Sequence, residues 1–552
     1  VSLLLDHDGG DIADDERIVA DGWKEITQNV DATGLAMGSD GSLYFALDVA
    51  DYSNAYLLDA EGLSRYDVHD ERGTIQRISP DLSRRETVCT GIRFPIALAF
   101  NDHGDLFCTE QEGATWLPNG NPFDELLHIR LDGTAPRQNV TGKRHFGFPP
   151  RHPRHNPFVI DEPSTFDYGP QHQSTCGMVF NPGVSSQRPF GSAWWAGDAI
   201  VCGESRGKLW RTTLVPTQEG YVAASQLVAA LQMLCVDACV AANGDLVVAC
   251  HSGPPDWGTG PAGIGKLFRI STSHIDAPRP VAVWAEGPHE IRVAFDQPIE
   301  PAAVSGLAAQ TVVEHGAFVR AGDRFETPEP PYAVVQMQKL APRHRLRVVS
   351  AALTADRRTM ALGTEPLTTR THLAVSLPWA AGIDAETLPP GSLPQHPHID
   401  VDASTDGVVV DWTPVTEGQP VAEPPVATTA AGWIPHLDLA VSRRLTQGSA
   451  GHDELWAGLA RPGTLELATS LDLNELLRPA VQPGSTLDHE WPPETATVTI
   501  RSNRAIELSA SVAGEPLAVR IVSDAAGDCL ASFTAPPGVR KPVQLSLVLA
   551  TG

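Results

Sequence analysis

The first half of the chain repeats one short unit, in which two alternating apolar strands flank a glycine turn. Three clear copies are GLAMGSDGSLYFALD from Gly34, ALAFNDHGDLFCTEQ from Ala97 and VDACVAANGDLVVACH from Val236. A looser copy joins CGMVFNPG from Cys176 to WWAGDAIVCGESRGKLWRTTL from Trp194. Strands of period two joined by D-G or N-G turns form hairpins, and repeated small antiparallel sheets are typical of β-propeller blades. The repeats predict an all-β fold with a five- or six-bladed propeller over residues 1–277.

The chain changes character after residue 277. HEIRVAFDQPIEPAAVSG and HRLRVVSAALTADRRTMA resemble strands of a small sandwich, so we predict an Ig-like β-sandwich over residues 278–378. The proline-rich LPPGSLPQHPHID predicts a linker over residues 379–399. Strands such as TATVTIRS and PVQLSLVLA predict a further β-rich domain over residues 400–552. The 48 glycines and 46 prolines among 552 residues exceed average usage, in agreement with many short strands joined by turns.

The charge of the chain restricts its partners. Its 40 basic residues stand against 67 acidic ones, a net charge of -27, and no dense Lys/Arg block occurs. A phosphate backbone requires clustered cations, so we expect no nucleic-acid partner. No apolar run reaches about 18 residues, so we expect no transmembrane segment in this chain. The chain opens without an initiator Met or a signal peptide, which we interpret as a mature, trimmed or partial product, periplasmic or extracellular.

The eight cysteines lie mostly in apolar strand-like runs such as DLFCTE and DLVVACH. A thiol in such a run behaves as a small hydrophobic side chain, so we predict buried thiols rather than zinc ligands. The sequence contains no C-x-x-C-H motif, and no haem is expected in this chain.

Polar residues follow or precede the repeated strands, where the loops of a propeller line one end of its channel. Those after the strands are Asp48, Glu110, Gln111, Glu204 to Arg206 and His251. Those near strand starts are Asp31, Arg93, His172 and Asp237. Their recurrence at equivalent blade positions favours a site, and solvated blade loops are the alternative.

The sequence GESRG, from Gly203 to Gly207, matches the G-x-S-x-G pattern of serine nucleophiles. That pattern presents its serine on a strained turn between a strand and a helix. Here KLWRTTLV follows, which reads as a strand. We therefore predict a hairpin turn at Ser205 rather than a nucleophile.

GIRFPIALAFNDHGDLFCTEQEG, FDELLHI and RHFGFPP resemble motifs of the glucose/sorbosone dehydrogenase family, soluble quinoprotein propellers. The wider chain is similar to large planctomycete and verrucomicrobial "membrane-bound dehydrogenase" proteins. The resemblance covers about residues 1–275 and implies pyrroloquinoline quinone (PQQ), calcium, a histidine base and an electron acceptor such as a cytochrome c. Those proteins often continue into a c-type cytochrome domain, which is not found in this sequence.

The carry-over of the family's residues is incomplete. Arg93 falls on the family's cofactor-binding arginine and Asp48 on an aspartate near the quinone. The position of the base histidine falls near Val30, beside Asp31, and the lysine position near Ser205, beside Arg206. The paired arginines of the last blade fall on Leu234 and Val236. A tricarboxylate requires several cations, so PQQ is suggested by the resemblance and disfavoured by these replacements.

Similar proteins carry a D-x-D-G-D-G-x-x-D loop where this chain reads DHDGGDIADD. Asp6, Asp8 and Asp14 keep three of the acidic places, whereas Gly10 and Asp11 are exchanged relative to the pattern. Calcium prefers such oxygen ligands, and its affinity depends on their number. The loop is a candidate calcium site, with a solvated turn as the alternative.

Three classes of function follow. The leading hypothesis is a secreted carbohydrate-active enzyme that oxidises a sugar or polyol hydroxyl, with His172 or Asp31 as base and Arg93 as anchor. The second is a cofactor-free glycoside hydrolase or lyase that uses two carboxylates as acid and base, from Asp48, Glu110, Glu204 and Asp237. The third is a non-catalytic glycan-binding or scaffold protein.

Overall fold

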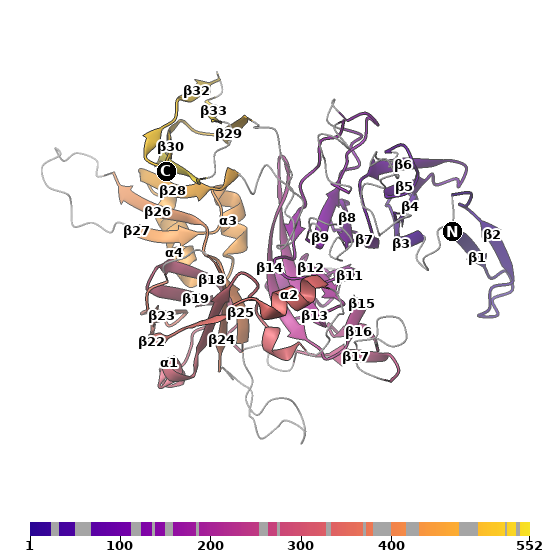
Figure 1. Ribbon diagram of the computed structural model, residues 1–552, viewed down its shortest axis with the longest axis horizontal. Coiled ribbons are helices and arrows are strands. Elements are labelled where there is room, and N and C mark those ends of the chain that lie inside the picture. Colours follow the sequence, from indigo (N-terminus) through magenta and orange to yellow (C-terminus); the bar gives the residue numbers. More distant parts are fainter. Residues whose placement is uncertain are drawn as a thin grey trace, which may run out of the picture.

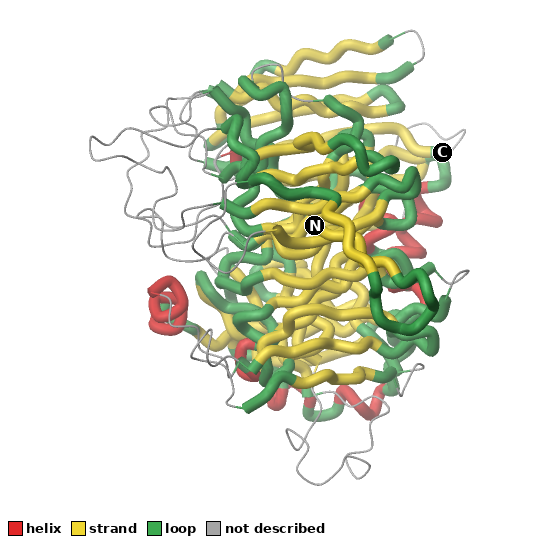
Figure 2. Tube along the Cα trace, turned by 90° about the vertical axis from the view of Figure 1, so that its right-hand side faces the viewer, coloured by secondary structure: helices red, strands yellow, loops and turns green. Residues whose placement is uncertain are grey.

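The computed structural model describes the chain in sixteen stretches. They are residues 1–23, 32–49, 68–111, 123–134, 139–148, 158–183, 187–252, 263–272, 277–326, 333–367, 371–378, 399–415, 430–473, 495–524, 527–536 and 541–552. Strands dominate these residues and helices are few and short (Figures 1 and 2), which confirms the all-β class. No described helix is long and apolar enough to cross a membrane.

The N-terminal half contains four blade-like antiparallel sheets within the described residues. Three have four strands in sequence order and the last has three. Their strands are β3 (Ala32–Met37), β4 (Leu43–Leu47), β5 (Thr74–Ile78), β6 (Arg85–Thr90); β7 (Pro95–Phe100), β8 (Leu106–Glu110), β9 (Glu125–Ile129), β10 (Phe166–Asp167); β11 (Thr175–Phe180), β12 (Ala199–Gly203), β13 (Lys208–Thr217), β14 (Gly220–Ala230); β15 (Leu234–Val240), β16 (Leu246–His251), β17 (Lys266–Ile270). The expected total of five or six blades stays a prediction.

The four sheets are arranged as propeller blades. The first strand of each sheet lies beside the first strand of the next, from β3 to β7, β11 and β15. The register of every one of these strands shifts near its start, where it pairs with the second strand of its sheet. Such bulges bend a strand and redirect its neighbouring loop. The repeated bulge therefore sets the loops that precede β7, β11 and β15 in equivalent positions.

A short hairpin precedes the blades. It pairs β1 (Ser2–Leu5) with β2 (Asp15–Ile18) and carries the acidic loop between them. In Figure 1 it projects at the right-hand end of the molecule, away from the other domains.

Two facing sheets form the second domain. Their orders are β18-β19-β23-β22 and β21-β20-β24-β25, and one core of buried apolar side chains joins them. The elements are β18 (Pro280–Gly287), β19 (Glu290–Phe295), α1 (Leu307–Gln310), β20 (Val312–Gly316), α2 (Ala333–Leu340), β21 (His344–Leu346), β22 (Val348–Leu353), β23 (Thr359–Thr364), β24 (His372–Leu377) and β25 (Ile399–Ala403). A β-sandwich was expected here, and its likeness to an immunoglobulin domain stays a prediction.

The sandwich extends further along the chain than its expected end at residue 378. β25 pairs with β24 along its whole length, and its alternate residues Val401 and Ala403 belong to the sandwich core. Of the expected linker, residues 379–398 lie outside the described residues, and Ile399 begins β25.

The C-terminal domain packs a six-stranded sheet, ordered β27-β26-β28-β34-β30-β31, against a three-stranded sheet, ordered β29-β33-β32. Its elements are β26 (Val408–Pro414), β27 (Ala430–Ile434), α3 (Leu439–Leu445), α4 (Ala450–Leu459), β28 (Gly463–Leu471), β29 (Ala496–Ser502), β30 (Ile506–Val512), β31 (Glu515–Pro516), β32 (Val519–Ser523), β33 (Cys529–Ala535) and β34 (Val543–Thr551). Trp412, with no exposed surface, lies in the core between them.

Seven of the eight cysteines are buried and only Cys239 is exposed. The prediction that most are buried thiols is therefore confirmed. Cys235 and Cys239 of the CVDAC segment would share a face of a regular strand, but the register shift between Cys235 and Asp237 places them on opposite faces of β15.

Candidate functional site at the junction of the first two domains

The residues expected at the blade ends occupy equivalent positions. Asp48 follows β4, Glu110 ends β8, Glu204 follows β12 and His251 ends β16, so each lies at the end of the second strand of its blade. Asp48, Glu110 and Glu204 are buried, whereas His251 is half-buried.

The first blade neutralises its own carboxylate. Arg72 Nη1 lies 3.3 Å from Asp48 Oδ1, and both side chains are buried. Sequence reasoning missed Arg72, whose position just before β5 carries no distinctive pattern. The pair fixes the end of the blade, because an unpaired charge in this environment would be costly.

The second blade brings together three expected residues. The Arg93 N–H donates to Glu110 Oε1, and the Arg93 guanidinium donates to the backbone carbonyl of Gln111. Gln111 Nε2 donates to Cys176 Sγ at 3.1 Å, which links this group to the next blade. Arg93 therefore holds protein groups of the blade loops, rather than projecting toward an open channel.

The third blade assembles a relay around His172. His172 Nδ1 lies 3.3 Å from Asp124 Oδ2, while Nε2 lies 3.0 Å from Ser174 Oγ and 3.3 Å from Ser205 Oγ. The two hydroxyl oxygens are 2.6 Å apart. The Asp124 carboxylate lies at ion-pair distance from Nδ1, without the geometry of a hydrogen bond, and the serine hydroxyls lie beside Nε2. This placement resembles the arrangement of carboxylate, imidazole and hydroxyl that activates a serine nucleophile.

Asp124 is positioned by backbone N–H groups of the loop that carries His172. Its Oδ2 accepts the N–H groups of Gln173 and Ser174 at 2.8 and 2.9 Å. Burial by itself raises the pKa of Asp124, but the His172 ring and these N–H groups together hold it below its usual value. Ser174 adopts a φ of +53°, in the left-handed region that non-glycine residues rarely occupy. A strained residue beside a charged relay is typical of functional sites.

Ser205 lies in the turn between β12 and β13, so the predicted hairpin turn is confirmed. The structure nevertheless places the Ser205 hydroxyl beside a histidine, which the local pattern did not predict. Gly207, in the left-handed region at φ +65°, is pressed against the carbonyls of Leu231 and Met233 and can carry no side chain. The turn that carries Ser205 is therefore tight, as in the G-x-S-x-G pattern, but a strand rather than a helix follows it.

Glu204, the residue before Ser205, is buried, and burial raises its pKa to about 7. A carboxyl group with this pKa can hold or release a proton near neutral pH. Among the carboxyl groups expected to act as acid or base, Glu204 therefore has the environment best suited to the role.

The sandwich domain covers this site. Gln338, on α2, accepts the His172 N–H at 3.2 Å and donates to the Pro170 carbonyl at 3.3 Å. His172, Ser174 and Ser205 are at most 4% exposed. In Figure 1, α2 overlaps the strands of the third blade, in agreement with these hydrogen bonds. The site is therefore built from two domains.

Two buried cations cross the same junction. Arg206 Nη1 lies 2.6 Å from Glu326 Oε2, and Lys208 Nζ lies 2.9 Å from Asp323 Oδ1 and 2.7 Å from Glu326 Oε1. Burial opposes the charge of Lys208, but the two carboxylates raise its pKa above the usual value. A cavity of about 200 Å³ adjoins these pairs, lined in part by Arg206, Glu326 and Gln338.

The described residues do not fit PQQ in the manner of the quinoprotein family. The cofactor carries three carboxylates, each of which requires a positive partner. Arg72, Arg206 and Lys208 already face protein carboxylates, and Arg93 donates to the backbone carbonyl of Gln111 in the loop after β8. Displacing these partners would leave buried protein carboxylates without partners, which costs several kcal/mol each. We derive no step through a quinone.

The remaining expected residues are Asp237, His251 and Asp31. Asp237 is exposed on the bulge of β15, and its carboxylate accepts the Ala238 N–H. His251, at the end of the central strand β16, pairs with Leu234 at the start of β15. Asp31 lies outside the described residues.

The acidic loop of the β1–β2 hairpin gathers Asp6, Asp8 and Asp14, with one oxygen of each within 4.8 Å of the others. All three side chains are exposed. Asp6 accepts the N–H groups of Gly9 and Gly10, and Asp14 accepts that of His7. This arrangement would suit a calcium ion, and it also satisfies a turn without one.

Asp124 and Ser174 were missed by sequence reasoning. Asp124 belongs to FDELLHI, which was noted only for its resemblance, and lies 48 residues before His172. The sequence did contain the serine of GESRG and a histidine, His172, as signs of a serine site. Their acidic partner, Asp124, is brought close only by the packing of neighbouring blades, which local sequence does not reveal.

Comparisons with known proteins give weak structural likenesses. No protein-family model matches the chain, and no curated protein sequence matches it. Among solved structures, a putative oxidoreductase (glucose dehydrogenase) from Thermus thermophilus is 21% identical over 47% of this chain and 70% of its own, with a TM-score of 0.33. A glucose dehydrogenase is 15% identical over 48% of this chain and 70% of its own, with a TM-score of 0.33. A putative gluconolactonase is 12% identical over 50% of this chain and 88% of its own, with a TM-score of 0.21.

Proposed function

We propose that this chain is a carbohydrate-active enzyme in which His172 is the general base for a hydroxyl group, and that the hydroxyl is that of Ser205. The observation that supports this proposal is the line from Asp124 through His172 to Ser205, with separations of 3.3 Å on each side of the ring. The reaction that follows is hydrolysis of an ester or lactone of a sugar. The carbohydrate class comes from the sequence resemblance.

The residues act in a defined order. His172 Nε2 takes the proton of Ser205 while Oγ attacks the ester carbonyl carbon, and Asp124 stabilises the resulting imidazolium. His172 then returns the proton to the departing alcohol oxygen, leaving an acyl group on Ser205. Water, deprotonated by His172, releases the acid and restores the serine. Ser174 Oγ, 2.6 Å from Ser205 Oγ, orients the attacking hydroxyl.

Substrate access requires movement at the domain junction. The relay is covered by Gln338 and by the buried pairs of Glu326 with Arg206 and Lys208. Contacts of this polar kind are typical of domain interfaces that open and close, and loop or domain closure excludes water from the reaction.

Hydrolysis of acetylated sugars and of aldonolactones by the purified chain tests the proposal. Ser205→Ala and His172→Ala should each lower kcat at least about 1000-fold. Ser83→Ala is a matched control, because Ser83 is an exposed serine in a blade hairpin turn. Equal rates in Ser205→Ala and in the unaltered chain would reject Ser205 as nucleophile. Glycan binding without any turnover would favour the non-catalytic alternative.

Oxidation of a sugar or polyol hydroxyl is the second candidate. It is favoured by the sequence resemblance and by the same His172–Asp124 pair, in which His172 would take the proton of a substrate hydroxyl while the hydride of the same carbon passes to an added redox acceptor. In that case the substrate oxygen must displace a serine hydroxyl from Nε2. Reduction of a dye acceptor with added sugar, PQQ and calcium, abolished in His172→Ala but retained in Ser205→Ala, would select oxidation. A cytochrome c acceptor and a periplasmic or extracellular location belong to this candidate as proposals.

A further inference from the structure

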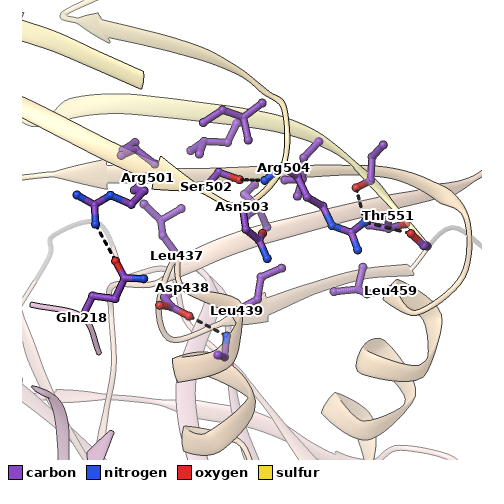
Figure 3. Close-up of a pocket in the computed structure, with 18 of the residues that line it drawn as sticks. Gln218, Leu437, Asp438, Leu439, Leu459, Arg501, Ser502, Asn503, Arg504 and Thr551 are labelled. Carbon is purple, nitrogen blue, oxygen red and sulfur yellow. Dashed lines mark hydrogen bonds between the residues drawn. The ribbon is translucent and has the colours of Figure 1, made fainter. Parts of the chain in front are cut away.

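A groove of about 740 Å³ opens on the C-terminal domain, remote in sequence from the His172 relay (Figure 3). The start of α3 and the end of α4 form one side, and the end of β29 with the turn that follows forms the other. Gln218, from the β13–β14 turn of the propeller, closes one end of the groove. Its side-chain oxygen accepts a hydrogen bond of 2.7 Å from Arg501 Nη1. The volume lies within the range of small-molecule sites.

The floor and walls of the groove are aliphatic. Leu467, Ile506 and Leu547 are buried parts of the domain core that reach the floor. Partly exposed aliphatic side chains continue this surface, namely Leu437, Leu439, Leu459, Ile500 and Leu549. Among the described lining residues there is no aromatic ring on which a sugar could stack. The surface therefore suits a hydrocarbon chain better than a glycan.

The rim carries positive charge. Arg501 and Arg504 project along the β29 side, and both are exposed. Arg504 Nη1 donates to the carbonyls of Ala550 and Gly552 at 3.3 and 3.2 Å, which holds its guanidinium over the end of the groove. The one carboxylate side chain among the described lining residues, Asp438, is engaged as the cap of α3, where Oδ1 accepts the N–H groups of Ala440 and Val441.

We propose that this groove binds an amphipathic molecule with one aliphatic chain and an anionic head group, such as a long-chain carboxylate. The aliphatic chain of the ligand lies on the leucine-lined floor, and its anionic head group pairs with Arg504. Within the described residues each rim guanidinium uses only Nη1. A guanidinium has five N–H donors and can hold a carboxylate through two of them. The charge at the rim is complementary to this head group, although the whole chain carries -27.

Calorimetric titration of the full chain with dodecanoate, below its micelle concentration, tests the proposal against neutral dodecanol. Dodecanoate should bind with one molecule per chain and more tightly than dodecanol. Arg504→Ala should weaken dodecanoate about 10-fold, the effect of one charge-assisted hydrogen bond, and leave dodecanol unchanged. Arg520→Ala is the matched control, since Arg520 is an exposed arginine on β32 that does not line the groove.

A second variant tests the aliphatic wall. Leu439 is the first residue of α3, and an acidic residue there is compatible with the helix start. Leu439→Asp should weaken both ligands at least 10-fold while the melting temperature stays near that of the unaltered chain. Equal binding of both ligands that neither variant changes would overturn the proposal and indicate non-specific adsorption. A concentration-dependent dimer lost in Arg504→Ala would overturn it in favour of a second copy of this chain.

Discussion

Two acidic regions of this molecule differ in what surrounds their carboxylates. The loop of the β1–β2 hairpin has the densest run of aspartates in the chain, yet Asp6, Asp8 and Asp14 are exposed and accept mainly backbone N–H groups of their own turn. Asp124 and Glu204 belong to no comparable run of aspartates, yet both are buried. Burial raises the pKa of Glu204 to about 7, and the Asp124 carboxylate faces His172, whereas the density of aspartates in the hairpin loop produces neither effect.

The largest expected effect concerns Asp124. Asp124→Asn keeps an oxygen for the N–H groups of Gln173 and Ser174 but removes the charge beside His172 Nδ1. We expect kcat for ester hydrolysis to fall about 10,000-fold with KM nearly unchanged, because the favoured imidazole tautomer is lost. Steady-state kinetics check this, with Asp6→Asn as the matched control from the exposed loop. Equal losses in both variants would erase the distinction between the regions.

The next effect concerns the buried cation of the junction. Lys208→Ala leaves Asp323 and Glu326 without their shared partner, so the free energy of unfolding should fall by about 3–5 kcal/mol. Urea unfolding followed by tryptophan fluorescence measures the loss. Lys266→Ala, at an exposed lysine on β17, should change it by less than about 0.5 kcal/mol. A loss as small in Lys208→Ala would show that the junction is open in solution.

Glu204 should make stability depend on pH. Its pKa is raised from 4.5 to about 7 by burial, so the folded chain keeps a proton that the unfolded chain has already lost. Stability therefore falls as pH rises between these values, by about 3 kcal/mol in total. Glu204→Gln should remove this component of the fall, whereas Glu219→Gln, at an exposed turn, should not. An unchanged slope in Glu204→Gln would contradict the buried, protonated carboxyl group.

The smallest effect is expected at the exposed loop. If Asp6, Asp8 and Asp14 bind calcium with the millimolar affinity of a weak site, 10 mM calcium should raise the melting temperature by about 2 °C. Thermal unfolding with and without calcium measures the gain, which the double variant Asp6→Ala, Asp8→Ala should lose and Asp21→Ala should keep. A gain equal in all three proteins would place the ion elsewhere.

The strand pairs of the propeller were predictable from local sequence. The glycine turns of GSDGS, NDHGD and AANGD give hairpins at β3–β4, β7–β8 and β15–β16. The reason is that a two-residue period and a turn residue are properties of neighbours in the chain. The extent of the sandwich was harder to predict from the sequence, because β25 pairs with β24 across a long intervening segment.

The site was predictable only in part. His172 was expected near the start of a strand and Glu204 after one; both are buried, and Gln338 of the second domain contacts His172. Asp124 is a neighbour of His172 only because two blades pack together, and Gln338 reaches it from another domain. Ser205 was assigned correctly to a hairpin turn, but its hydroxyl partner depends on the same packing. Contacts of this range leave no local pattern.

The most direct test of the central claim is covalent labelling of the chain with a fluorophosphonate, followed by mass spectrometry of its peptides. A serine hydroxyl activated by His172 attacks phosphorus, displaces fluoride and retains the phosphonyl group. The account predicts one labelled residue, Ser205, and no label in His172→Ala. A chain that stays unlabelled, or is labelled at another serine while Ser205 is unmodified, would contradict it.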